Sequence, residues 1–266
     1  MSSLSGLRQR IATVATIKKT THAMRLIAMS NHARLRGDLE RLRQYTSDVE
    51  TIGVPATSGH STQDNTRRVF VIVGSEKGLC GSFNTTLFEY CSREIFPQVS
   101  TDSVFISVGK QVREHLEEKG IPRIAQYEPL SLATFKEHAR NLAQRIMIDH
   151  VHDRIVFVFN ESKTFFVRTV SMRDYRVDFF SAHQAGDSSV EGDVQALGEY
   201  RERLRLQSFI LRCFGESLIA EQAARFMSMD LSTRNAEALL EGMRLDYNKM
   251  RQALITRELT DLTSAL

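Results

Sequence analysis

The chain has 266 residues, a formal net charge of +3, 42% hydrophobic and 25% charged residues, which is ordinary for a globular protein and excludes disordered or collagen-like chains. No run approaches eighteen consecutive apolar residues, so no membrane-spanning segment is predicted. Three scattered cysteines exclude a disulfide framework and favour a reducing compartment.

The N-terminal segment predicts one long helix over residues 4–50. Its apolar residues recur in steps of three and four, no proline precedes Pro55, and the helix would be roughly 70 Å long. A helix of that length must lie against another element. The first 37 residues contain seven Lys and Arg and no acidic residue. This basic face is either solvated or meets an acidic partner or nucleic acid.

The central segment predicts an open α/β sheet. Residues 52–67 are polar turn formers and are expected to form a loop. Beyond them, short β-branched and aromatic runs alternate with segments of helical length, which is typical of parallel strands joined by helices. The predicted strands are 68–74, 103–108 and 154–160, and the predicted helices are 83–97, 109–119 and 131–150. Two further runs, 164–170 and 175–180, predict added antiparallel strands.

The C-terminal segment predicts a second long helix, over 194–266, after a flexible joint at 184–193. It would be roughly 110 Å long. Its seam has heptad spacing, which is typical of a coiled coil. The seam residues are Ala236, Leu240, Met243, Tyr247, Met250 and Leu254.

Both long helices carry a narrow apolar seam, and the simplest way to bury the two seams is against each other. We therefore predict a long antiparallel two-helix coiled coil, in which the C-terminal helix overhangs, plus a central open α/β (Rossmann-like) sheet domain. The predicted segments are 1–55, 66–183 and 190–266. A cluster of small residues lets backbones approach closely, at Ala220, Ala223 and Ala224.

The stretch "GSEKGLCGSF" at 74–83 follows a buried strand and has three interpretations. It lacks the spacing of a Walker loop and of a dinucleotide fingerprint. Cys80 could act as a nucleophile at a helix start, but no motif ties a histidine to it. The favoured interpretation is a strand-to-helix corner, in which Gly78 and Gly81 allow the turn and Ser82 or Asn84 caps the helix.

Three blocks together resemble the gamma subunit of rotary ATP synthases. They are "LRQRIATVATIKKTTHAMRLIAMS" near the N-terminus, "SEKGLCGSFN" at the corner, and "EQAARFMSMDLSTRNAEALLEGMRLDYNKMRQALITRELTDL" near the C-terminus. Their joint order spans the chain. The chain departs from the family pattern at His22, Asn31 and Arg257 and in its terminal "TSAL".

The resemblance implies a non-catalytic central-stalk rotor that couples ion-driven rotation of a c ring to conformational cycling of a catalytic ring. The implied partners are the alpha and beta subunits, the epsilon subunit and the c-subunit ring. No cofactor, metal, nucleic acid or direct membrane insertion is implied. The expected location is the cytoplasmic face of a bacterial inner membrane, as a peripheral part of the complex.

The resemblance also implies contacts with the alpha/beta ring. Residues of the basic N-terminal face would meet acidic segments of the beta subunits, and residues near the C-terminal tip would meet a catch region; the two groups are Arg8, Arg10, Met24 and Arg25, and Arg257, Glu258 and Thr260. Two alternatives remain. One is a basic coiled-coil nucleic-acid-binding protein with an α/β domain, although aromatic residues do not interleave with the basic run. The other is a hydrolase that uses Cys80.

Overall fold

The computed structural model describes residues 4–51, 67–99, 103–121, 125–126, 130, 131–149, 153–177 and 194–263. The predicted joint at 184–193 lies outside the described residues, as does the predicted loop at 52–67 except for Arg67. Contacts divide the chain into two compact units. We call them the two-helix unit, made of 1–29 and 225–266, and the sheet unit, made of 30–224. The three predicted segments stay a prediction.

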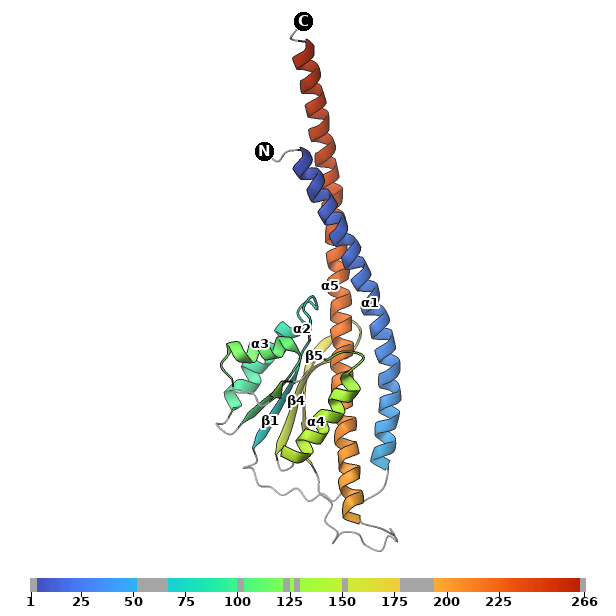
Figure 1. Cartoon of the computed structure of the whole chain (residues 1–266), viewed down its shortest axis with the longest axis vertical. Coiled ribbons are helices and arrows are strands. Elements are labelled where there is room, and N and C mark those ends of the chain that lie inside the picture. Colours follow the sequence, from blue (N-terminus) through green and yellow to red (C-terminus); the bar gives the residue numbers. More distant parts are fainter. Residues whose placement is uncertain are drawn as a thin grey trace. The chain divides into compact units, whose positions relative to one another are not determined.

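Two long helices form the ends of the chain, as predicted (Figure 1). Helix α1 covers Leu4–Thr51 and helix α5 covers Val194–Thr263. Neither contains proline, and each therefore keeps its backbone hydrogen bonds over many turns. Each helix contributes residues to both units.

In the two-helix unit, α1 and α5 pair in antiparallel order. Lys18 contacts Glu237, whereas Arg25, further along α1, contacts Asp230, which lies earlier on α5. The predicted seam is buried at its first two positions, Ala236 and Leu240, and Leu7, Ala28 and Met229 of the same unit are buried as well. It then fades toward the C-terminus through half-buried Met243, Tyr247 and Met250 to exposed Leu254. On α1, Ile17 is exposed although it belongs to the apolar residues spaced by three and four.

The sheet unit contains five strands in the order β3-β2-β1-β4-β5. Their bounds are β1 Arg68–Val73, β2 Val104–Val108, β3 Ala125–Gln126, β4 Arg154–Ser162 and β5 Arg168–Tyr175. The first four run parallel, and β5 pairs antiparallel with β4. The predicted open, mostly parallel sheet is confirmed, and short β3 was not predicted.

The prediction of two strands at 164–170 and 175–180 is wrong for the described residues. A single strand, β5, covers only Arg168–Tyr175, and residues 178–180 lie outside the described part. The aromatic residues that suggested an earlier start belong to the turn before β5, where the Lys163 amide donates to the Val167 carbonyl at 3.0 Å. There Phe165 packs edge-on against His32 of α1, with ring centroids 4.8 Å apart.

The helices between the strands are α2 Phe83–Tyr90, α3 Lys110–Glu118 and α4 Phe135–Asp149. The predicted helix 83–97 is instead a composite, in which α2 leads into a π-helical turn, Cys91–Ile95, and a 3-10 turn, Phe96–Gln98. Pro97 lies in the last turn and cannot donate a backbone hydrogen bond, so the helix ends there.

Both faces of the sheet are covered, which explains why its central strands are almost continuously apolar. Helices α2 and α3 cover one face, and α4 with the sheet-unit part of α5 covers the other (Figure 1). Leu35 and Leu39 of α1 belong to the core on the face of the sheet that α4 and α5 cover. The largest buried side chains of that core include Leu35, Phe135, Phe157, Phe159 and Phe214.

Candidate functional site

The corner after β1 turns through two left-handed residues. Gly81 has φ 58°, as expected for one of the predicted glycines, but the second left-handed residue is Leu79, with φ 63°. Gly78 lies at a bend of the same corner but is not left-handed, so its part in the turn stays a prediction. Glycine is favoured at such positions because it has no Cβ, whereas Leu79 adopts the conformation with a Cβ and with its side chain 62% exposed.

Asn84 and Ser75 close the corner through their side chains. The Ser75 amide donates to Asn84 Oδ1 at 3.1 Å, and Asn84 Nδ2 donates to Ser75 Oγ at 2.7 Å. Ser82 stands at the start of α2, but its side chain makes no capping hydrogen bond. Ser82 thus occupies the predicted N-cap position without a side-chain capping bond, and the alternative cap by Asn84 is wrong because Asn84 turns back to the end of the strand.

Cys80 is only 2% exposed and packs with Phe83, Ala220 and Ala224. Asn84 Nδ2 lies 3.5 Å from its sulfur. A thiol in this position offers no access to a substrate. Cys80 therefore packs the corner against α5. Ala220 and Ala224, which were expected to let backbones approach closely, also pack against this corner.

The two-helix unit is joined by cross-helix ion pairs. Lys18 Nζ lies 2.5 Å from Glu237 Oε1, and Arg25 Nη1 lies 2.6 Å from Asp230 Oδ1. Asp230 also binds Arg234, one turn further along α5, at 2.9 Å. The hydrogen bond from Arg25 lowers the pKa of Asp230, and the hydrogen bond from Lys18 lowers the pKa of Glu237.

These pairs divide the predicted basic face into neutralised and free charges. Arg25 is expected to meet a partner, yet in this chain its charge is already matched by Asp230. Arg8, Arg10 and Lys19 are exposed, and within the described part of the chain they make no ion pair. Met24, beside Arg25, is half-buried. Arg34 and Arg36 are also exposed and make no ion pair among the described residues, so free basic charge remains at both ends of the predicted basic run.

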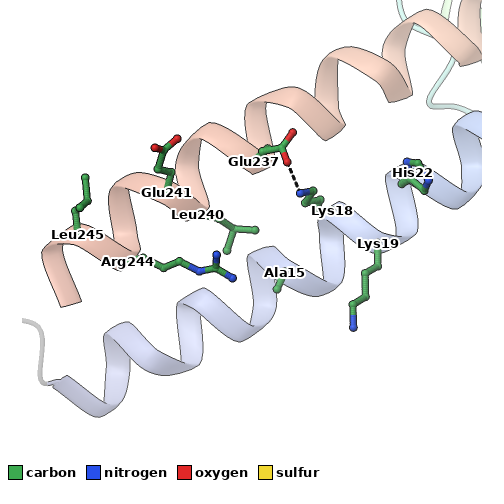
Figure 2. A pocket seen from close by; sticks show the side chains of 9 residues that line it. All are labelled: Ala15, Lys18, Lys19, His22, Glu237, Leu240, Glu241, Arg244 and Leu245. Atoms are coloured by element: carbon green, nitrogen blue, oxygen red, sulfur yellow. Dashed lines mark hydrogen bonds and ion pairs between the residues drawn. The ribbon is translucent and has the colours of Figure 1, made fainter. Parts of the chain in front are cut away.

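Two open grooves run between the helices of this unit. The first, about 750 Å³, is lined by residues of both signs, and Figure 2 shows Lys18 reaching Glu237 across it while Lys19 points away. The second, about 990 Å³, contains Arg10 and Leu7 from α1 and Met243 and Met250 from α5. In both grooves, side chains of the two helices leave space between them that a partner's side chains could fill.

Helix α5 continues beyond its last contacts with α1. From Arg251 to Thr263, every residue whose exposure is described is exposed. The expected contact residues lie here: Arg257 pairs loosely with Asp261 at 4.0 Å, and Thr260 Oγ1 donates to the Thr256 carbonyl at 2.8 Å. Leu259 next to them is 58% exposed. We call this segment the overhang.

Sequence analysis missed three buried carboxylates on α5, which are Glu202, Glu216 and Glu221. Glu202 is 1% exposed and Glu216 is 4% exposed, and each contacts β5 of the sheet. Periodicity places both among apolar residues of α5, but it says nothing about the partners that make burial of a charge possible. The only sequence signal is an arginine near each on the same helix.

Within the described ranges, no group of three or more His, Cys, Asp and Glu side chains is arranged to hold a metal ion. No helix among the described residues combines the length and the apolar character needed to cross a bilayer.

Comparison with known proteins places the chain. A family model described as ATP synthase matches residues 3–266. The ATP synthase gamma chain of Clostridium botulinum (strain Kyoto / Type A2) is 26% identical over 279 residues, covering 98% of this chain and 96% of that protein. That of Chlorobium luteolum is 28% identical over 288 residues, covering 98% and 97%.

Solved structures share the fold. A chain in the rotor of the Euglena gracilis mitochondrial ATP synthase superimposes with a TM-score of 0.62 at 19% identity, covering 94% of this chain and 99% of that one. A chain in the central stalk and c-ring structure of the Tetrahymena thermophila enzyme gives 0.59 at 18% identity, covering 79% and 98%. With a family match along almost its whole length, the chain belongs to the ATP synthase gamma chain family.

Proposed function

We propose that this chain is the central-stalk rotor subunit of a rotary ATP synthase and has no catalytic site of its own. The observation that carries the proposal is the full-length family match, on a chain whose two ends pair as antiparallel helices with α5 overhanging α1. Such a shaft can push on a surrounding ring because a helix pair joined by ion pairs is stiff along its length. Its unequal faces make every angle of rotation distinct.

The ring contacts follow from the free surface of the two-helix unit. Arg8 and Arg10 meet acidic segments of the beta subunits, because their charges are exposed and are not matched within the described chain. Met24, further along α1 beside Arg25, adds an adaptable apolar contact. The overhang is the second contact, where Arg257, Glu258 and Thr260 meet the catch region of the ring. Its exposed leucines then become buried on assembly.

The sheet unit contacts the epsilon subunit and the c-subunit ring. The complex places the chain at the cytoplasmic face of a bacterial inner membrane, as a peripheral protein. Support for these partners comes from family membership and from the solved rotor assemblies in which chains of this fold occur. Coupling to a proton-driven c ring is part of the same proposal.

Reconstitution tests the proposal. The purified chain is mixed with alpha and beta subunits, and ATP hydrolysis and rotation of a probe on the chain are measured. We expect no hydrolysis by the chain alone and rotation coupled to hydrolysis in the mixture. A chain that does not assemble with the ring, or that assembles without rotating, would contradict the proposal.

The charge contacts are tested by the double substitution Arg8→Gln/Arg10→Gln. Long-range attraction between exposed charges speeds association and is screened by salt. We expect slower assembly at low salt and a weaker dependence of the assembly rate on salt. The matched control is Arg34→Gln, an exposed arginine further along α1 in the sheet unit, which should leave both quantities unchanged. Equal assembly rates for the double variant and the control would remove Arg8 and Arg10 from the contact.

The nucleic-acid alternative loses part of its support. Lys18 and Arg25, two cations of the basic run, are bound by carboxylates of α5, which reduces the charge available to phosphates.

A further inference from the structure

Among the described contacts, a hydrogen bond and an ion pair join buried carboxylates of α5 to the sheet. The Tyr175 hydroxyl donates to Glu202 Oε1 at 2.8 Å. Arg173 Nη2 lies 3.2 Å from Glu216 Oε2. Both glutamates are almost fully buried, and both sheet residues belong to β5. Buried carboxylates are rare unless they are paired, so their presence here requires these partners.

Each carboxylate is shared between its own helix and the sheet. The second oxygen of Glu202 is held by Arg205, at 3.0 Å, and the second oxygen of Glu216 accepts from Arg212 Nε at 3.0 Å. The arginine on α5 fixes the carboxylate relative to the helix, so the remaining oxygen presents one direction to β5. This arrangement differs from an exposed ion pair, in which both side chains can change conformation and keep the contact when the helix moves.

The sheet side of the contact is equally constrained. Arg173 Nη2 donates to Glu161 Oε1 of β4 at 2.9 Å, and its guanidinium lies 5.5 Å from the centroid of the Phe159 ring. The arginine is thus held by two strands before it reaches Glu216. A planar guanidinium in such a frame has little freedom to follow a helix that turns.

The two contacts are far apart along α5 but close together along β5. Glu202 and Glu216 are fourteen residues apart, which is just under four turns and about 21 Å along α5. Arg173 and Tyr175 are two residues apart on one face of β5, about 7 Å along the strand. The two side chains therefore diverge to reach points far apart on the helix. Apolar packing alone resists rotation weakly because it has no preferred direction, whereas separated polar contacts resist both rotation and tilt.

We propose that the Tyr175–Glu202 and Arg173–Glu216 contacts form an angular lock that fixes the rotational setting of the sheet on α5. The assignment of a mechanical role rests on the proposed rotor function. In that role the lock passes torque between the sheet unit and the helix that enters the catalytic ring. These four side chains are positioning residues and take part in no chemistry.

The first test uses the full chain alone. Spin labels are attached at Ile148→Cys on α4 and Tyr200→Cys on α5, both exposed, and the distribution of distances between the labels is measured by pulsed electron paramagnetic resonance. The native cysteines are buried and so are poorly accessible to the label. The variant Arg173→Met/Glu216→Met removes the contact without leaving an unpaired buried charge. We expect the distribution to become broader than that of the wild-type chain, since the ion pair that restrains α5 on the sheet is lost while packing remains.

The matched control is Arg154→Gln/Asp174→Asn. This pair joins β4 to β5 and does not involve α5. Because side chains alternate along a strand, Asp174 points to the opposite face from Arg173 and Tyr175. The control should keep the width of the wild-type chain. A single change, Tyr175→Phe, removes only the hydroxyl and should broaden the distribution to a smaller extent, which provides a second test if the methionine variant does not fold. Unchanged widths in both lock variants would overturn the proposal.

The second test uses the assembled complex. The alpha/beta ring is fixed to a surface, a probe is attached at Ile148→Cys, and angular fluctuations are recorded while rotation is stalled without nucleotide. We expect wider fluctuations in the lock variant than in wild type and control. Equal widths of the angular fluctuations in the lock variant, the control and the wild-type chain would refute torque transfer through the lock. If the wild-type chain does not rotate in the ring while the spin-label widths change as expected, the rotor function fails and the structural lock stands.

Discussion

Gly109 joins β2 to α3 in a conformation that other residues strongly avoid. Its φ is 91° and its ψ is 146°. A Cβ at this position would lie 2.7 Å from the Gly74 carbonyl oxygen and 3.0 Å from the Ser75 carbonyl oxygen. Both oxygens belong to the corner after β1, so the clash cannot be relieved by moving a flexible side chain. The substitution Gly109→Ala therefore perturbs two neighbouring strand ends at once.

The expected cost adds backbone strain to lost hydrogen bonds. A non-glycine residue in this region of φ and ψ costs of order 1–3 kcal/mol. Moving the two strand ends apart weakens the bonds from the Gly74 amide to the Val108 carbonyl and from the Gln111 amide to the Ser75 carbonyl, which are 3.0 and 3.2 Å long. Each is worth about 1 kcal/mol. We therefore expect the free energy of unfolding of the sheet unit to fall by about 3–5 kcal/mol.

Urea unfolding monitored by circular dichroism measures this loss. The midpoint of the transition should fall by more than about 1 M. The control is Gly37→Ala, in the middle of α1, where an added Cβ meets no atom within 4 Å. There alanine should increase stability by up to about 1 kcal/mol, because it favours the helix. A Gly109→Ala midpoint within experimental error of wild type would refute the reasoning from φ and clash.

The ion pairs of the two-helix unit should make its stability depend on acid. Because Arg25 lowers the pKa of Asp230 in the folded chain, the pair stabilises the unit above the ordinary aspartate pKa, and this stabilisation is lost as pH falls through the lowered value. The difference in melting temperature between wild type and Asp230→Asn should therefore shrink from pH 7 to pH 3. A constant difference would contradict the assignment. Burial raises the pKa of Cys91 to about 12 and also raises the pKa of Cys213, so iodoacetamide at pH 8 should label neither thiol in the folded chain and both in urea, as read by mass spectrometry. Truncation after Met250 should leave the melting temperature of the isolated chain unchanged, because the overhang buries nothing against the rest of the described chain, whereas a marked drop would show that it does.

Local patterns in the sequence identify the elements. Steps of three and four between apolar residues, with no proline, predict helices that agree with Leu4–Thr51 and Val194–Thr263. β-branched runs predict the three central parallel strands to within two residues at each end. These signals are local because each element must bury one stripe or face, and the spacing of that stripe is set by the geometry of the element itself.

Tertiary structure decided the partners. The single strand β5, the left-handed Leu79 and the turn of Asn84 toward Ser75 all depend on atoms brought close by the fold. The same holds for Arg25, whose charge is matched by a carboxylate 205 residues away in sequence. A charged side chain shows no preference in the sequence for one opposite charge over another, so its pairing follows only when packing has fixed the distances.

The sequence by itself determined that two helix-forming ends enclose an α/β segment, because helix and strand periods are properties of a few neighbouring residues. Only the tertiary structure decided which charges become buried contacts. Glu202 and Glu216 are ordinary helix residues by spacing, and they are buried because Tyr175 and Arg173 lie where α5 crosses the sheet. Burial of a charge is stable only with its partner in place, and that condition involves the whole fold.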